Sequence, residues 1–314
     1  MFARITIFLL FIFFFTNNNN CKAQDLLNFQ QAEDSLVKMI RVMVEERDLP
    51  KKMSFNNHFK DFFQSVLERD SSFHYPFDSL IHIGKLKSSD GIVKVFTWNV
   101  PTMNGMHKYY GFIQTRINEK TAVYPLYDER DKFEIPQLEV TSPEKWFGAL
   151  YYCLHENKYL DKTYYTLLGV DLNNLFSRKR VIEILTLDNE GKPILGQPII
   201  SVRNHLISRI VFEYSSQANM ILKFDSAMNM IVFDHLSPMR NDFAENYQFY
   251  GPDLTFDALR FDQGKWVYTP NIDIRNPLRE QAPMPISPPV ENPEPGFLYQ
   301  PNRISNEATP AKKE

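Results

Sequence analysis

The feature that most constrains the fold is an alternation of apolar and polar residues with a period of two, which begins near residue 92 and recurs as far as residue 269. Successive side chains of a strand point to opposite faces, so this period predicts β-strands. The short connections predict antiparallel pairing, because a parallel pair needs a crossover of about a dozen residues. Strands are expected at 92–98, 107–115, 121–127, 146–154, 162–169, 180–187, 208–214, 219–225, 229–235, 257–262 and 265–269.

A period close to 3.6 precedes the strands and predicts two amphipathic helices within residues 24–75. The first is expected to end at Pro50, and the second is expected to begin after Ser54, as its N-cap, and to run to Asp70. Each helix needs a surface for its apolar stripe, and the strands that follow supply one. The stripes consist of Phe29, Ala32, Leu36, Met39, Ile40 and Met43 in the first helix, and of Phe55, Phe59, Phe62, Phe63, Val66 and Leu67 in the second.

These patterns together predict an α+β fold that is mainly β. An N-terminal helical pair packs on a large antiparallel β-meander, the domain of residues 76–275, which is sandwich-like or a strongly bent sheet. A propeller-like arrangement is the alternative, with four-stranded blades at 146–200 and 208–250. No internal sequence repeat supports it.

The first 23 residues are typical of a secretory signal peptide. Arg4 precedes an apolar run that is too short to span a bilayer, and cleavage after Ala23 fits the small residues there. The alternative is a lipid anchor on Cys21, which Asn18 disfavours because lipid-attachment sites usually have an aliphatic residue three positions earlier. Export then leaves Cys153 without an intramolecular disulfide partner, as a buried apolar filler. We therefore expect a periplasmic or extracellular protein.

The charge balance argues against nucleic acid as a partner. The chain has 35 basic and 38 acidic residues, and loss of Arg4 and Lys22 with the signal peptide gives 33 − 38 = −5. Phosphate binding depends on clustered Lys and Arg, and the sequence has no basic stripe. After the signal peptide no apolar run is long enough to cross a membrane.

A change of composition marks the C-terminal tail, residues 276–314. Half of the chain's 20 prolines lie beyond residue 269. Proline donates no backbone hydrogen bond, and the segment has no periodic apolar face. We expect a largely disordered tail, or alternatively a proline-rich ligand for a partner.

The adjacent Asp234 and His235 invite a catalytic interpretation, but in a strand they point to opposite faces. A hairpin loop at residues 226–228 sets Asp234 across from Met220 and His235 across from Asn219, so that neighbour brings no carboxylate to His235. A more distant segment supplies the alternative: His235 or His155 acting with Asp253 or Asp257. No catalytic residue is therefore assigned.

The sequence predicts no cofactor and no metal. It lacks the G-x-S-x-G, H-E-x-x-H and phosphate-loop motifs, and its seven histidines are scattered. Two acidic clusters, residues 128–134 and the group Asp253, Asp257 and Asp262, contain oxygen ligands that suit calcium. Neither has the spacing of a calcium loop, so both are interpreted as structural turns.

Tyrosine doublets are the strongest binding signal. In a strand each doublet places one ring on each face, so one ring can fill the core while the other lies on a possible binding surface. Trp98, Trp146 or Trp266 could extend such a surface. If a second layer covers the outer face, the rings are core residues instead. The candidate binding residues are Tyr109, Tyr110, Tyr151, Tyr152, Tyr164, Tyr165 and Trp98.

Several phrases together resemble an uncharacterised family of exported proteins from Bacteroidetes-type bacteria, across roughly residues 78–276. They are SSDGIVKVFTWNV, KTYYTLLGVDLNN, RIVFEYS, IVFDHLSP, YQFYGPDLTFDA and GKW before DIRNP. The family has no assigned activity, so the resemblance implies export and carries over no site residue.

The function expected from the sequence is non-catalytic: an exported protein of the bacterial envelope that binds a ligand or protein partner through an aromatic sheet face. One alternative is a hydrolase acting on an envelope or extracellular polymer. The other is a structural subunit of an envelope assembly, attached through its proline-rich tail.

Overall fold

Two helices form where apolar residues repeat every three to four positions. In the computed structural model, which describes residues 26–274, the first helix covers residues 26–45 and is followed by α2 (Leu49–Leu67). Asp48 caps α2 by accepting a hydrogen bond from the Lys51 N–H at 3.0 Å. Pro50 lies in the first turn, where its missing N–H costs nothing. The prediction that Ser54 caps this helix is therefore wrong, because the second helix begins at Leu49 and the first ends at residue 45, before Pro50.

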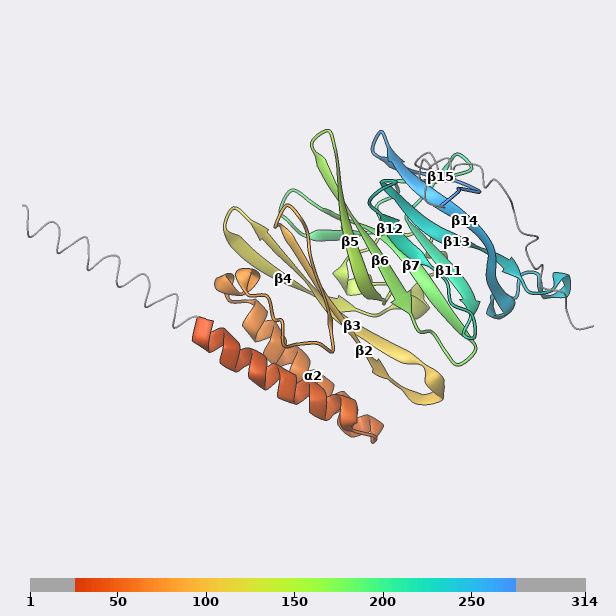
Figure 1. Ribbon diagram of the computed structural model, residues 1–314. Helices are drawn as coiled ribbons and strands as arrows, with labels where there is room; N and C mark the ends of the chain where they lie inside the picture. The colour runs from red at the N-terminus through yellow and green to blue at the C-terminus, as the bar shows by residue number, and fades with distance from the viewer. Residues whose placement is uncertain (1–25, 275–314) are drawn as a thin grey trace, which may run out of the picture. The chain divides into compact units, whose positions relative to one another are not determined.

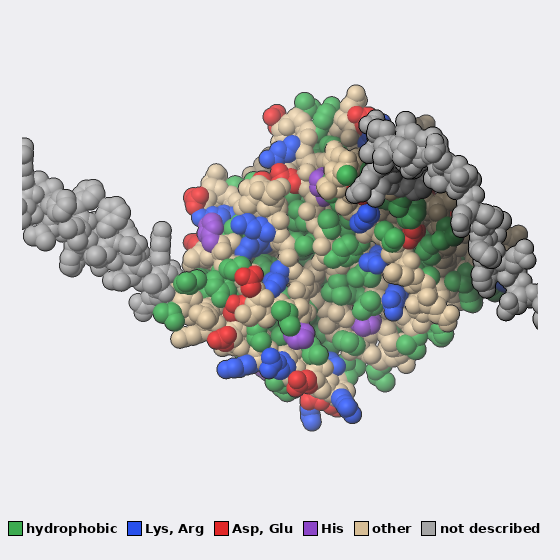
Figure 2. Space-filling view, viewed as in Figure 1, with side chains coloured by type: hydrophobic (Ala, Val, Ile, Leu, Met, Phe, Trp, Pro, Cys, Tyr) green, Lys and Arg blue, Asp and Glu red, His purple; other side chains and the backbone are tan. Residues whose placement is uncertain are grey.

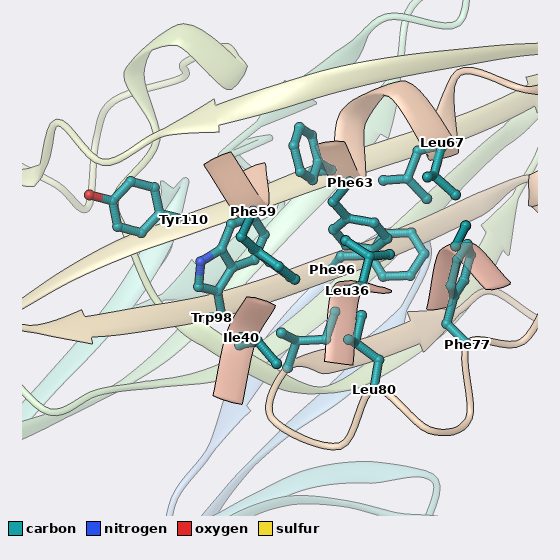
Figure 3. Close-up of a cluster of buried hydrophobic side chains, with 14 of the residues drawn as sticks. Leu36, Ile40, Phe59, Phe63, Leu67, Phe77, Leu80, Phe96, Trp98 and Tyr110 are labelled. Carbon is teal, nitrogen blue, oxygen red and sulfur yellow. The ribbon is translucent and has the colours of Figure 1, made fainter. Parts of the chain in front are cut away.

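The first sheet packs under these helices in the order β1-β2-β3-β4, with every pair antiparallel. Figure 3 shows the core between them, where Phe63 of α2 contacts Phe96 and Phe112 at ring distances of 5.2 and 5.7 Å. The Trp98 indole N–H donates to Asn56 Oδ1 at 2.8 Å, which satisfies a buried donor. The strands are β1 (Gly84–Lys87), β2 (Val93–Pro101), β3 (His107–Ile117) and β4 (Lys120–Tyr127).

Two further sheets follow the first (Figure 1). The middle sheet has the order β11-β7-β6-β5, with β8 paired to β7. The third sheet has the order β10-β9-β15-β14-β13-β12, in which β15 and β9 form the parallel pair. The middle sheet consists of β5 (Leu150–Tyr159), β6 (Lys162–Asp171), β7 (Ser177–Leu187), β8 (Pro193–Leu195) and β11 (Arg209–Ser215). The third consists of β9 (Ile200–Val202), β10 (His205–Ile207), β12 (Leu222–Asp225), β13 (Met230–Pro238), β14 (Tyr250–Asp262) and β15 (Lys265–Thr269).

Short 3₁₀ helices occupy several of the connections. They are η1 (Asp70–His74), η2 (Met103–Gly105), η3 (Arg130–Lys132), η4 (Pro143–Lys145), η5 (Asn241–Phe243) and η6 (Tyr247–Phe249). The helices and all three sheets belong to one compact unit that ends at Asp273. The predicted signal peptide and the predicted tail of residues 276–314 lie outside the described residues.

Three hydrophobic cores hold these layers together. The first lies between the helices and the first sheet, the second between the first and middle sheets, and the third between the middle and third sheets. Along β6, Tyr165 and Leu167 enter the second core, whereas Tyr164 and Leu168 enter the third. Successive side chains of the middle sheet therefore enter two different cores in turn, and both faces of this sheet are buried.

The fold class predicted from the sequence, α+β and mainly β with a helical pair on antiparallel strands, is confirmed. The propeller-like alternative is wrong, because β11 joins β5–β8 in one sheet while β12 and β13 join β14 and β15. Four short strands, β1 and β8–β10, were not predicted, since three or four residues show no clear alternation.

The predicted register of the β12–β13 hairpin is also wrong, by one residue. Asp225 pairs with Met230, because its carboxylate accepts the N–H groups of Ala227 and Met228 and the loop extends to Asn229, which has a φ of 53°. Asp234 consequently lies across from Ile221, and not from Met220. A shift of one residue reverses which face each side chain meets.

A fully buried ion pair joins two neighbouring strands of the middle sheet, β7 and β11, at residues that lie opposite each other. Arg209 and Glu183 are both 0% exposed, and Arg209 Nε donates to Glu183 Oε1 at 2.7 Å. The Tyr151 hydroxyl donates to the other carboxylate oxygen, and Arg209 Nη1 donates to the Pro136 carbonyl at 2.7 Å. The pair thus fixes both the strand register and the segment that follows β4.

Replacing one partner of this pair should be costly. We expect Arg209→Met to lower the free energy of unfolding by about 3–5 kcal/mol, because Glu183 stays buried without its counter-charge. The double variant Arg209→Met with Glu183→Gln should recover much of the loss. Urea unfolding measures both. Lys192→Met, which breaks an exposed pair with Glu144, is the control and should change stability by at most about 1 kcal/mol.

Candidate functional site

The tyrosine doublets separate as the period of two predicts, but a layer covers almost every face they reach. Tyr109 enters the second core and Tyr110 the first, while Tyr151 enters the second. Of the six tyrosines only Tyr152 is exposed, at 41%, and its hydroxyl donates to the Leu222 carbonyl at 2.7 Å. Trp98, Trp146 and Trp266 are buried as well. These side chains are therefore mostly core residues, and the expected row of exposed rings is not found among them.

Two of the candidate tyrosines do line a cavity. It has a volume of about 870 Å³ and lies at one end of the first and middle sheets, where hairpin turns converge. The β3–β4 turn contributes Asn118, the β5–β6 turn contributes Asp161, and the end of β7 contributes Thr186. Tyr164 and Tyr165 of β6 form part of the wall. The structure thus brings this doublet together with residues from two hairpin turns and from the end of β7.

The polar groups of this cavity are largely unoccupied. The side chains of Tyr164 and Thr186 are only 8% and 9% exposed, yet their hydroxyls have no hydrogen-bond partner within residues 26–274. Gln197 is half-buried, and its side-chain amide likewise has no partner in the described chain. These groups are accessible from the cavity, so all three are free to hydrogen-bond a bound molecule or water.

The cavity walls are anchored by their own hydrogen bonds. The Tyr165 hydroxyl donates to Asp90 Oδ2 at 2.7 Å, and burial together with this acid raises the pKa of Tyr165 above its ordinary range. Asp188 accepts the N–H groups of Glu190 and Lys192 at 2.9 and 2.8 Å, which fixes the turn after β7. A rigid frame holding unpaired polar groups is what a binding site requires.

The lining carries balanced charge. Arg116 and Lys162 are basic, and Asp161 and Asp188 are acidic, so the formal sum is 2 − 2 = 0. Arg116 is paired with Glu119, while Lys162 has no ion pair among the described residues. A neutral molecule therefore meets no net electrostatic penalty here.

A second cavity, of about 470 Å³, differs because three of its four charged lining residues, Arg130, Lys179 and Glu213, are in ion pairs. Arg130 pairs with Asp171 at 2.9 Å and with Asp128 at 3.4 Å. Burial raises the pKa of Asp128 despite Arg130 beside it. Glu213 accepts from Ser177 at 2.5 Å and from Asn173 at 3.3 Å. These pairs join the ends of strands, although Asp128 Oδ1 and Asp171 Oδ2 are buried without a hydrogen-bond partner among residues 26–274.

His235 does meet a carboxylate, but from β14 and not from β12. His235 Nδ1 lies 2.8 Å from Asp257 Oδ2, and since a carboxylate only accepts, Nδ1 is the donor. Asp234 turns instead to the Ile221 N–H, at 2.6 Å. β13 is a strand across both residues, as predicted, and a register shift between Asp234 and Leu236 accompanies the change of partner.

Asp257 holds this histidine within a saturated network. Its carboxylate also accepts from the Tyr268 hydroxyl at 2.7 Å and from the Asn271 N–H at 3.0 Å. Burial alone would raise the pKa of Asp257, but the hydrogen bonds from Tyr268, His235 and Asn271 outweigh it and hold the pKa below its ordinary value of 3.8. His235 is 46% exposed and lines neither of the two cavities above.

The other catalytic candidates do not hydrogen-bond to this pair. Burial would raise the pKa of Asp253, but the Thr255 hydrogen bonds and nearby His235 lower it. Asp253 hydrogen-bonds to Thr255. His155 stacks on Phe224 with ring centroids 3.5 Å apart, and burial lowers the pKa of His155. Within residues 26–274 the structure contains no group of three or more His, Cys, Asp or Glu residues arranged for a metal ion. Cys153 is half-buried, and burial raises its pKa.

Two general surface properties bear on partners. On the face shown in Figure 2, basic and acidic side chains are interspersed, without a continuous stripe of either sign. Among the helices of the described region, none combines the length and the apolar character needed to cross a bilayer.

Comparison of the chain with protein-family models, with curated proteins and with solved structures found no match. The family resemblance noted in the sequence therefore stays a prediction.

Sequence reasoning missed Thr186 and Gln197. Each is an isolated polar residue near a strand end, and neither belongs to a motif. The doublet at Tyr164 and Tyr165 was the available signal, but the cavity forms only where turns from two sheets meet.

The hydrogen bonds of Asp257 should affect how the free energy of unfolding decreases at acidic pH. Because folding lowers the pKa of Asp257, its contribution is complete above the unfolded value near 3.8 and is lost as pH falls through the lower folded-state value. We expect Asp257→Asn to abolish this component of the pH dependence and to leave the neutral-pH slope unchanged. Urea midpoints measured from pH 7 down to pH 2 test this. Parallel curves for the two proteins would contradict it.

Proposed function

We propose that this chain is an exported, non-catalytic binding protein of the bacterial envelope, and that its ligand occupies the cavity of about 870 Å³ at the end of the first and middle sheets. The observation that carries the proposal is that the Tyr164 and Thr186 hydroxyls line this cavity, are accessible from it and have no hydrogen-bond partner within residues 26–274. The buried charges of Glu183 and Arg209, by contrast, are engaged by protein partners.

The ligand that fits best is a small neutral molecule rich in hydroxyl groups, of the size of a mono- or disaccharide. Hydroxyls and side-chain amides both donate and accept, so they match sugar hydroxyls in either sense. The balanced lining charge supports a neutral ligand. The rings of Tyr164 and Tyr165 are buried, so they offer no stacking platform. The Tyr164 hydroxyl is free to hydrogen-bond, whereas the Tyr165 hydroxyl already donates to Asp90.

Export rests on the sequence of residues 1–23, whose apolar run and small residues before the predicted cleavage position are typical of a signal peptide. An envelope location brings the protein into contact with polysaccharides and their breakdown products. The location and the ligand class are therefore chemically compatible.

Hydrolysis is the second candidate function, and the contact between His235 and Asp257 favours it. A buried carboxylate that orients Nδ1 leaves Nε2 available as a general base. In the described residues, however, no serine, threonine or cysteine hydrogen-bonds to His235, so the reaction would need an activated water. The structural-subunit hypothesis depends on the tail, which lies outside the described residues.

Removing single hydroxyls from the cavity should test binding directly. We expect Tyr164→Phe and Thr186→Val each to weaken the binding of a neutral saccharide by roughly threefold to tenfold, the value of one neutral hydrogen bond. Titration calorimetry of the full chain against a panel of neutral mono- and disaccharides, with their uronic acid counterparts, measures this.

Tyr127→Phe is the matched control, because Tyr127 is 50% exposed in β4 and does not line the cavity. His235→Gln should bind as the unaltered protein does. If no neutral saccharide in the panel binds, or if Tyr164→Phe binds as tightly as the control, this site is not the saccharide site. Turnover of a saccharide that disappears in His235→Gln would favour the hydrolase instead.

A further inference from the structure

Two hairpin turns far from the proposed ligand cavity expose large apolar side chains. Met103 and Met106, between β2 and β3, are 72% and 44% exposed. Leu175 and Phe176, between β6 and β7, are 64% and 68% exposed. Single exposed apolar residues are ordinary, but four in two neighbouring turns are a concentration that calls for a function.

The two turns form one surface, the apolar tip, which we define as Met103, Met106, Leu175 and Phe176. In Figure 1 the β2–β3 and β6–β7 turns end side by side. The contact between them is close, since a Cβ added to Gly105 would lie 2.4 Å from Leu175 Cδ2. Gly105 also has a φ of 70°, so glycine is required there for both reasons.

Hydrogen bonds hold the first of these turns in shape. The N–H of Thr102 donates to the Met106 carbonyl at 2.7 Å, and the Thr102 hydroxyl donates to the same oxygen at 3.0 Å. The Met106 N–H in turn donates to the Met103 carbonyl at 3.2 Å. The methionine side chains are thus displayed by an ordered backbone.

The second turn is held in the same way. Asn174 Oδ1 accepts the N–H groups of Phe176 and Ser177 at 2.8 and 3.0 Å. Ser216, from the next turn, donates through its hydroxyl to the Leu175 carbonyl at 2.8 Å and through its N–H to the Phe176 carbonyl at 2.9 Å. Leu175 and Phe176 are therefore fixed in an outward-facing backbone rather than free to collapse onto the core.

Each turn leads directly into a basic residue without a counter-ion. Lys108 follows the first turn and Arg178 the second; both are exposed, and neither has an ion pair among residues 26–274. The acids behind the tip, Asp128 and Asp171, face inward on Arg130. Asp131 is the one exposed acid that shares a cavity with Met106 and Lys108.

We propose that the apolar tip inserts into the interface of a membrane that contains anionic lipid. Large apolar side chains flanked by Lys and Arg are the combination that binds such a surface, the former entering the headgroup region and the latter contacting lipid phosphates. A second copy of the chain fits less well, because four side chains on two turns fall well short of the about 800 Å² that each partner of a stable interface buries.

A tryptophan reporter tests insertion. The three native tryptophans are at most 1% exposed, so a Phe176→Trp variant adds the one solvent-sensitive indole in the described chain. With vesicles of phosphatidylcholine and phosphatidylglycerol we expect its emission to shift to the blue, and with phosphatidylcholine alone to shift much less. Leu254→Trp, at a position that is 88% exposed on β14, is the matched control and should not shift.

Co-sedimentation with the same vesicles separates the contributions. The double variant Leu175→Ser with Phe176→Ser should bind at least about tenfold more weakly, and Lys108→Gln or Arg178→Gln roughly fivefold more weakly for each charge removed. Leu254→Ser should bind as the unaltered protein does. Equal binding by the Leu175→Ser, Phe176→Ser variant overturns the proposal. So does a vesicle-independent dimer, in analytical ultracentrifugation, that this variant loses.

Discussion

The constraint on which the rest of this structure depends is that the middle sheet is covered on both faces. Strand β6 sends Tyr165 and Leu167 toward the first sheet and Tyr164 and Leu168 toward the third. Neither face can therefore be polar without internal partners, and the alternation of the sequence becomes an alternation between two cores. The tyrosine doublets, which suggest a binding surface when considered alone, are accommodated mainly as core residues.

Polar groups within this covered sheet are of two kinds, those with protein hydrogen-bond partners and those without. Glu183 and Arg209 lie opposite each other on paired strands and are fully satisfied, so they fix the register without being available to a ligand. At the open end of the same sheet, Tyr164 and Thr186 are nearly as buried, yet their hydroxyls have no partner in the described chain. The Tyr164 and Thr186 hydroxyls are candidate binding groups because they are free and face a cavity.

The elements that the sequence predicted well are those with long periodic runs. Both helices were recognised, and strands such as β3, β6 and β7 were placed closely, because eight or more residues establish a period. The start of α2 was misplaced because Pro50 can begin a helix as well as end one. The partner of His235 was considered among several carboxylates but could not be chosen, since Asp257 reaches it only through the pairing of β13 with β14.

The sequence by itself determined the mainly β class, the helical pair before it and the orientation of neighbouring tyrosines to opposite faces, because these are local consequences of backbone geometry. Tertiary structure alone decided what covers each face, which strands share a sheet, and that Thr186 and Gln197 meet Tyr164 around one cavity. These depend on contacts between segments separated by tens of residues. A period in one segment contains no information about which other segment will lie against it.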